Sequence, residues 1–316
     1  MDVVPTKGQA WATDPFTLTE VEGRLHGRGS CDMKGFLAAT TCALTPELIG
    51  SLTRELTLIW THDEEVGCTG SQALVEALEA EGRPLPSQVL IGEPTDFHVC
   101  RMHPGHMTMR ISCRGIPAHS SRPTLGCSAI QLAGEVLTAL HGLASEWEHD
   151  APNTAIQAKG EPSSHHVLNV GRIEGGTAVN IIPEHCHLDV GIRPLPGTEA
   201  STIVSAVAAS LESLVARAKG LGAEIKWSLL QSTPGLLTPE NSPLSTQLQA
   251  HLGCGHLHGV PFATDGGNLA KLGTQPIICG PGSIDQAHRA DEFVTILDLH
   301  RAERLVGDLV RLRCTP

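Results

Sequence analysis

Five acidic or imidazole side chains in this sequence stand beside glycine-bearing turns, where a side chain can face a ligand. Asp32 lies in the run GRGSCDMKG, Glu64 and Glu65 in THDEEVG, Glu93 in IGEPTD, and His288 in GPGSIDQAH. Neighbouring carboxylates such as Glu64 and Glu65 repel each other unless a positive charge faces them. Carboxylates together with an imidazole suit a divalent ion, zinc above all. If one glutamate binds the metal, its neighbour is free to act as a base.

Four of these residues also have a purely structural explanation when each is taken alone. Asp32 precedes an apolar run and fits a helix N-cap. Glu65 and Glu93 fit solvated loop acids, and His288 fits a packed or hydrogen-bonded histidine. The metal interpretation therefore rests on the combination of residues and on the elements that position them.

Those elements follow from the apolar periodicity. The spacing predicts helices over 33–50, 70–82, 126–145, 200–219, 243–252 and 297–312, and strands over 55–61, 87–96, 106–115, 166–175, 184–194, 224–230, 259–263 and 275–279. Helix and strand alternate at both ends of the chain, which indicates an α/β domain with a mainly parallel sheet over 1–104 and 233–316. The β-α-β-β-α-β order between them indicates an inserted α+β (split βαβ) domain over 105–232. Ligands gather at the carboxyl ends of such parallel strands, where Glu64, Glu65 and Glu93 fall.

Composition limits the classes of protein that this chain can belong to. Its 316 residues are enough for two domains, and its net charge of −12 argues against nucleic acid as a partner. The sequence shows no continuous apolar run of the roughly 20 residues that span a membrane, and its first residues lack the order of a secretory signal. We therefore expect a cytoplasmic protein. The ten cysteines are spread without any C-x-x-C pair, so we expect reduced thiols rather than a metal cluster.

The motifs become recognisable when they are taken together. The runs GRGSCDMKGFLAA, THDEEVGCTGS, IGEPTD, AHSSRP, LNVGRIEGGTAVNIIPEHCHLDVGIRPLPG and CGPGSIDQAHRADEFV resemble the M20 family of metallopeptidases and deacylases. The resemblance covers essentially the whole chain, and the motifs occur in the order of the family. It implies a zinc hydrolase that carries an inserted dimerisation domain, and hence a homodimer.

The resemblance also implies a role for each residue of the metal site. Asp32 would bridge two zinc ions in each subunit, with cobalt as a possible substitute. Glu65 and His288 would complete the ligands of one ion, and Glu93 would bind the other. Glu64 would be the general acid/base, which takes a proton from the attacking water and delivers it to the leaving amine.

Three residues of the inserted domain match positions that act on the substrate. His119, in AHSSRP, matches a histidine that reaches a neighbouring active site and stabilises the oxyanion. Its alternative role is to cap its own turn. Asn180 and Arg193 match substrate-binding positions, and Arg193 suits an α-carboxylate. The alternative for Arg193 is a surface arginine on a strand.

The first metal motif of the family departs from this sequence. The family has His-x-Asp followed by an apolar pair and proline, and here the chain reads MDVVP. Asp2 matches the aspartate, a catalytic position that would orient the histidine, and the histidine itself is absent. The second metal site is therefore expected to be incomplete. We expect this chain to be a fragment of a longer product or a poorly active version.

The function that follows is hydrolysis of a small N-acyl amino acid. Within the resemblance, the runs LNVGRIEGGTAVNIIPEHCHLDVGIRPLPG and PFTLTEVEGRLHGRG are most similar to the subgroup that removes acetate from N2-acetyl-L-ornithine, which implies a step of arginine biosynthesis. The alternatives are succinyl-diaminopimelate desuccinylation, another N-acyl-amino-acid deacylation, or dipeptide hydrolysis. A non-catalytic relative that binds ligand without turnover is the remaining alternative, and no nucleic acid or membrane partner is expected.

Overall fold

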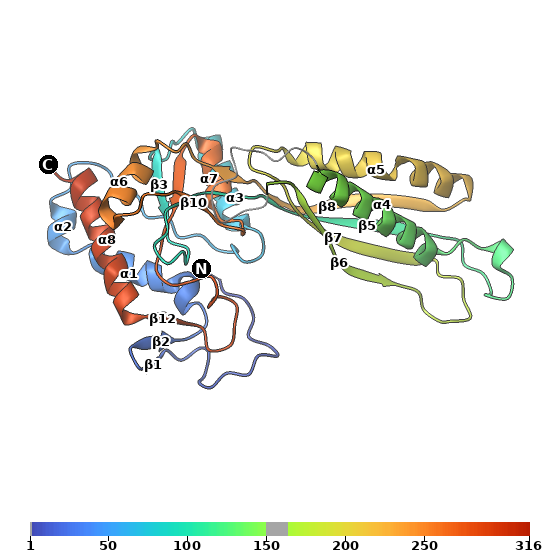
Figure 1. Cartoon of the computed structure of the whole chain (residues 1–316), viewed down its shortest axis with the longest axis horizontal. Coiled ribbons are helices and arrows are strands. Elements are labelled where there is room, and N and C mark those ends of the chain that lie inside the picture. Colours follow the sequence, from blue (N-terminus) through green and yellow to red (C-terminus); the bar gives the residue numbers. More distant parts are fainter. Residues whose placement is uncertain (1, 150–163) are drawn as a thin grey trace. The chain divides into compact units, whose positions relative to one another are not determined.

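The computed structural model describes residues 2–149 and 164–316, which divide into two compact units (Figure 1). Unit 1 comprises the chain up to Met102 together with Thr238–Val260 and Thr264–Pro316. Unit 2 comprises His103–Leu237 and Pro261–Ala263. The catalytic role expected for 1–104 with 233–316, and the lid role expected for 105–232, stay predictions.

A mixed sheet forms the centre of unit 1. Its strands lie in the order β10 (His258–Gly259), β4 (Cys100–His103), β11 (Gln275–Ile278) and β3 (Gln88–Ile91). The pairs β10–β4 and β11–β3 are parallel, and a short antiparallel pairing of β11 with β4 joins them. The expected α/β class is confirmed, and β3 ends directly before Gly92 and Glu93.

Helices pack around this sheet. They are α1 (Gly35–Ala43), α2 (Pro46–Gly50), α3 (Thr69–Glu81), α6 (Pro243–Leu252), α7 (Gly266–Leu269) and α8 (Ile296–Cys314), with short turns at Ser30–Lys34 and Ala270–Leu272. Phe36 of α1, Ile277 of β11 and Leu305 of α8 belong to one buried core. This core holds the loops that carry the acidic residues.

A second, small sheet lies in unit 1. The strands β1 (Thr19–Val21), β2 (Arg24–His26) and β12 (Phe293–Thr295) pair antiparallel in the order β1-β2-β12. His26 pairs with Phe293, so the end of β2 lies beside the start of β12. The two loops that carry Asp32 and His288 adjoin these strand ends.

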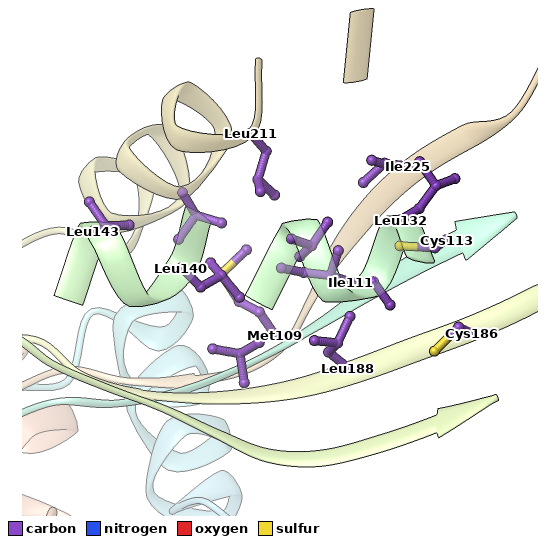
Figure 2. Close-up of a cluster of buried hydrophobic side chains, with 14 of the residues drawn as sticks. Met109, Ile111, Cys113, Leu132, Leu140, Leu143, Cys186, Leu188, Leu211 and Ile225 are labelled. Carbon is purple, nitrogen blue, oxygen red and sulfur yellow. The ribbon is translucent and has the colours of Figure 1, made fainter. Parts of the chain in front are cut away.

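Unit 2 is a four-stranded antiparallel sheet with two helices on one face (Figure 1). Its elements are β5 (His106–Arg114), the 3-10 turn Pro123–Leu125, α4 (Ala129–His149), β6 (Val167–Gly175), β7 (His185–Arg193), α5 (Ala200–Gly220), β8 (Glu224–Thr233) and β9 (Leu236–Leu237). Alternate residues of β5 and β7, such as Met109 and Leu188, meet Leu140 and Leu211 of the helices in the core (Figure 2). The predicted β-α-β-β-α-β order is confirmed.

Helix α5 is long and apolar enough to cross a membrane by length and composition alone, with a mean hydropathy of 1.2 over its most apolar window. Its buried residues Ile203, Val207 and Leu211 belong to the core that α4 and the sheet share. We therefore assign α5 to the core of unit 2.

Several of the predicted elements are wrong in detail. The strands predicted over 87–96 and 259–263 are shorter, at Gln88–Ile91 and His258–Gly259. The predicted helix over 33–50 is split, because Pro46 starts a new helix whose first turn Thr45 caps through Leu48 N–H. The segment 55–61 is not a strand. Its sequence favours an extended backbone, but a strand needs a neighbour within hydrogen-bonding distance, and this segment and β3 both line a cavity without pairing.

Candidate metal centre

Two carboxylates and one imidazole converge in unit 1. The Nε2 atom of His288 lies 3.1 Å from a carboxylate oxygen of Glu65 and 3.3 Å from one of Asp32. The three candidate ligand atoms lie within 4.8 Å of one another. Asp32 and Glu65 are largely buried, while His288 is half-exposed. One ion could therefore contact all three side chains after small shifts.

Asp32 reaches this point from a tight turn rather than from a helix cap. The turn Ser30–Lys34 follows Gly29, whose φ of 79° is a left-handed conformation that favours glycine. The N-cap of α1 is Lys34, and no side chain caps that helix end. The alternative explanation of Asp32 as the cap of α1 is therefore wrong, and its carboxylate is left to face His288.

Glu64 and Glu65 lie in the loop that leads into α3. Their backbone N–H groups both donate to the carboxylate of Asp2, each at 3.1 Å. Asp2 thus holds the backbone of this loop in the structure. With its backbone fixed, Glu65 is directed toward His288.

Burial and neighbouring negative charges raise the pKa of Glu64 and of Glu93. Burial, and then the charges of Asp265, Glu65 and Asp32, raise the pKa of Glu64 to about 8. Burial, and then Asp32 and Glu64, raise the pKa of Glu93 well above its usual range. So much negative charge in a buried site favours a bound cation.

The negative charge of the site also acts on His288. Hydrogen bonds to Asp32 and Glu65 raise its pKa to about 10, so without a metal the imidazolium supplies a positive charge at this point. A divalent ion would take the place of that proton, because neutral imidazole is a common metal ligand. The donor set of oxygen and nitrogen atoms fits zinc.

A cavity of about 450 Å³ extends from these residues into unit 1. Asp32, Glu64 and Glu93 line it together with apolar residues such as Leu58 and Leu90. Carboxylates at an apolar cavity are typical of a small-molecule site.

The three candidates of unit 2 lie in two places. The backbone of His119 bridges to Ile181, and Ser120 N–H donates to the carbonyl of Asn180 at 3.0 Å, so His119 and Asn180 are neighbours. Arg193 lies at the far end of β7, roughly 25 Å along the strand from its start. The structure therefore does not bring Arg193 together with the other two within unit 2.

Local contacts define the hydrogen bonding of the His119 ring and the burial of Arg193. Ser121 N–H donates to Nδ1 of His119 at 3.2 Å, so a neutral ring carries its proton on Nε2. This contact fits the alternative in which His119 stabilises its own turn, and it leaves Nε2–H as a donor. Arg193 is half-buried, and burial lowers its pKa. Because Arg193 lies on strand β7 with part of its side chain exposed, the alternative of a surface arginine on a strand stays open.

Sequence reasoning missed three residues that border the site. Asp265 accepts a hydrogen bond of 2.6 Å from the Thr61 hydroxyl and lines the same cavity. Glu292 and Arg28 form a buried ion pair beside the turn of Asp32. The available signal for Glu292 was its place within the recognised run CGPGSIDQAHRADEFV, whereas Asp265 lies outside the recognised motifs.

Two carboxylates and an imidazole that loops of an α/β unit bring to one point fit the metal centre of a hydrolase, and the chain also contains a separate β-α-β-β-α-β unit. The family described as peptidase family M20/M25/M40 matches residues 1–312. The chain therefore belongs to this family of metal-dependent enzymes.

Known proteins show the same relationship. The chain is 33% identical to an acetylornithine deacetylase of Proteus mirabilis over 314 residues, which are 99% of the chain and 78% of the relative. An acetylornithine deacetylase of Myxococcus xanthus is also 33% identical over the same shares. An M20 family metallo-carboxypeptidase from Sulfolobus solfataricus shares the fold with a TM-score of 0.72 at 17% identity, over 98% of this chain and 83% of that one.

Proposed function

We propose that the chain hydrolyses N2-acetyl-L-ornithine to L-ornithine and acetate with bound zinc, as a step of arginine biosynthesis in the cytoplasm. The observation that carries the proposal is the convergence of Asp32, Glu65 and His288 beside Glu64. The names of the relatives at 33% identity support the acetyl substrate.

The ligand roles follow the geometry. Asp32, Glu65 and His288 hold one ion, and their oxygen and nitrogen atoms already lie within 4.8 Å of one another. Asp32 also lies beside Glu93, which raises the pKa of Glu93. We therefore assign Asp32 as the bridge to a second ion that Glu93 binds. Cobalt can replace zinc in such oxygen and nitrogen sites.

Glu64 moves the protons of the reaction. Zinc, when bound, polarises the acyl carbonyl and makes the attacking water more acidic. Glu64 accepts a proton from this water as its oxygen adds to the acyl carbon. It then donates the proton to the amine nitrogen as the C–N bond breaks. The carboxyl group of Glu64 holds that proton between the two steps.

Residues of unit 2 also act on the substrate. Arg193 pairs with the α-carboxylate. His119, with Asn180 beside it, acts on the substrate of a neighbouring copy, where Nε2–H of His119 stabilises the oxyanion. We also propose that unit 2 joins two copies of the chain in a homodimer, and exposed apolar side chains such as Ile173 and Val179 support this.

A substrate panel with a Glu64→Gln variant tests the proposal. Metal-free protein is loaded with zinc or cobalt and supplied with acetyl-ornithine, succinyl-diaminopimelate and a dipeptide. We expect hydrolysis of acetyl-ornithine, which a chelator abolishes. In Glu64→Gln we expect turnover to fall by about 10²- to 10⁴-fold with metal content unchanged.

Glu76→Gln is the matched control, because Glu76 lies exposed on α3 and accepts a hydrogen bond from Gln72. It should keep full turnover. Preference for the succinyl or peptide substrate would reassign the substrate, and equal turnover of wild type and Glu64→Gln would remove Glu64 as the base. Metal binding without turnover of any substrate would favour a non-catalytic relative.

A further inference from the structure

The carboxylate of Glu292 is buried at the back of the turn that carries Asp32. One oxygen accepts from Arg28 Nη1 at 2.6 Å and from Gly29 N–H at 3.0 Å. The other accepts from Cys31 N–H at 2.9 Å and from Asp32 N–H at 3.0 Å. The side chains of Glu292 and Arg28 are each only 1% exposed. The carboxylate of Glu292 therefore accepts four hydrogen bonds from residues 28–32.

The small sheet of unit 1 explains how Glu292 reaches this place. Because β2 and β12 are antiparallel neighbours, the residue before β12 lies beside the residues after β2. Gly27 N–H donates to the carbonyl of Glu292 at 3.0 Å and continues the pairing. The left-handed φ of Gly29 turns the following amides toward the carboxylate, as in an anion-binding nest.

The same network reaches the segment of His288. Gln9 accepts from Arg28 Nη2 at 2.5 Å, and its own side-chain N–H donates to the carbonyl of His288 at 2.7 Å. Glu292 is thus linked to Asp32 directly, and to the backbone of His288 through Arg28 and Gln9. The two ligands come from turns more than 250 residues apart in the sequence, and this network joins the turns.

We propose that Glu292 is a positioning residue that sets the distance between Asp32 and His288, and so determines how tightly the site binds metal. The proposal rests on the metal site assigned under the proposed function. Glu292 itself does not touch the ion or the substrate. Its four hydrogen bonds fix the backbone of Asp32, and outer partners of metal ligands typically change affinity by about 10- to 100-fold.

Cobalt titration of the full chain tests the proposal without substrate. Cobalt(II) absorbs visible light with a spectrum that reports the ligand geometry. The Glu292→Gln variant carries an amide of nearly the same shape. Its NH2 group cannot accept the two hydrogen bonds that one carboxylate oxygen of Glu292 accepts. We expect cobalt affinity to fall by roughly 10- to 100-fold with a changed absorption band, while circular dichroism shows a folded chain.

If Glu292→Gln does not fold, a second variant still tests the proposal. Gln9→Ala removes the link between Arg28 and His288 and leaves the buried ion pair of Arg28 with Glu292 intact. It should lower cobalt affinity and shift the band by a smaller amount. Glu240→Gln is the control, since Glu240 pairs with Arg101 away from the site and should change neither.

Unchanged affinity and spectrum in both folded variants would overturn the positioning role. If the wild-type chain binds no cobalt, the result contradicts both the proposed metal site and the positioning role of Glu292. If the wild type binds cobalt and both variants weaken it, but no acyl amino acid is hydrolysed, the positioning role stands and the proposed function fails.

Discussion

The carboxylate of Asp2 accepts a hydrogen bond of 3.1 Å from the backbone N–H of Glu65. Its other oxygen accepts one of equal length from Glu64. One side chain thus fixes the backbone of both the candidate metal ligand and the candidate base. Charge-assisted hydrogen bonds of this kind are stronger than neutral ones, so the loop depends on Asp2 for its shape.

We therefore expect Asp2→Ala to reduce turnover about 10- to 100-fold when metal is saturating, because the loop of Glu64 and Glu65 is released. Steady-state kinetics of acetyl-ornithine hydrolysis measure this loss. Asp14→Ala is the control, since Asp14 accepts from Phe16 N–H in a turn in the same way, at 3.0 Å. Equal loss in both variants would mean that Asp2 acts through general stability.

Removal of His288, the candidate nitrogen ligand, should abolish the effect of zinc on the thermal stability of the chain. A ligand at 100 times its Kd stabilises a folded protein by about 2.7 kcal/mol. We expect zinc to raise the melting temperature of the wild type and to leave that of His288→Ala nearly unchanged. Differential scanning calorimetry with and without zinc measures both shifts.

His300→Ala is the matched control for that experiment. His300 is an exposed histidine of α8 that pairs with Glu303, and its loss should leave the zinc shift intact. A full zinc shift in His288→Ala would show that the ion binds elsewhere.

The types of residue and their flanking turns made the main site readable from the sequence. Asp32, Glu65 and His288 each lie in a glycine-bearing motif, and the structure brings these three together. Family resemblance supplied their roles. The alternation of β5 and β7 likewise predicted the core of unit 2, because one face of a half-buried strand must be apolar.

The sequence carried no comparable signal for the contacts that support the site. Glu292 meets the backbone of Gly29, 263 residues away, and no spacing rule predicts which buried carboxylate a turn will use. Asp2 was expected to have lost the imidazole that it would orient, and the sequence did not predict that it accepts hydrogen bonds from two backbone amides. Residues 55–61 have strand propensity, but pairing depends on a neighbouring strand, which local sequence does not specify.

Gly92 approaches the core too closely to accept a side chain. A Cβ atom there would lie 1.9 Å from Cδ1 of Phe36, a buried residue of α1. We expect Gly92→Ala to destabilise the chain by about 1–3 kcal/mol, since overpacking forces neighbours apart. It should also weaken metal binding, because Glu93 follows directly. Urea denaturation and metal content measure the two effects.

Gly134→Ala provides the opposite expectation. Gly134 lies exposed in α4, and its added Cβ would meet nothing within 4 Å. Alanine in a helix interior is favoured by roughly 0.5–1 kcal/mol over glycine, so this variant should be as stable as the wild type or more so. Equal destabilisation of both variants would contradict the packing argument.

His103 should make the stability of the chain depend on pH. The side chain is completely buried, and Nδ1 lies 2.8 Å from the carbonyl of Pro104, so the neutral ring donates from Nδ1. Burial, and then the charge of Arg193, lower its pKa to about 4, against an unperturbed value near 6.5. The unfolded chain therefore binds a proton first as the pH falls, and stability is lost between about pH 6.5 and pH 4.

Between pH 7 and pH 5 this single group should cost about 2 kcal/mol of unfolding free energy. Urea denaturation of the metal-free chain at the two pH values measures the loss, and His103→Gln should show a smaller one because glutamine does not titrate. His106, whose pKa is also lowered to about 4, continues to contribute in the variant, so part of the pH dependence remains. His300→Ala, which removes an exposed histidine, should keep the wild-type dependence. If His103→Gln and the wild type lose equal stability over this range, the buried neutral imidazole is not its source.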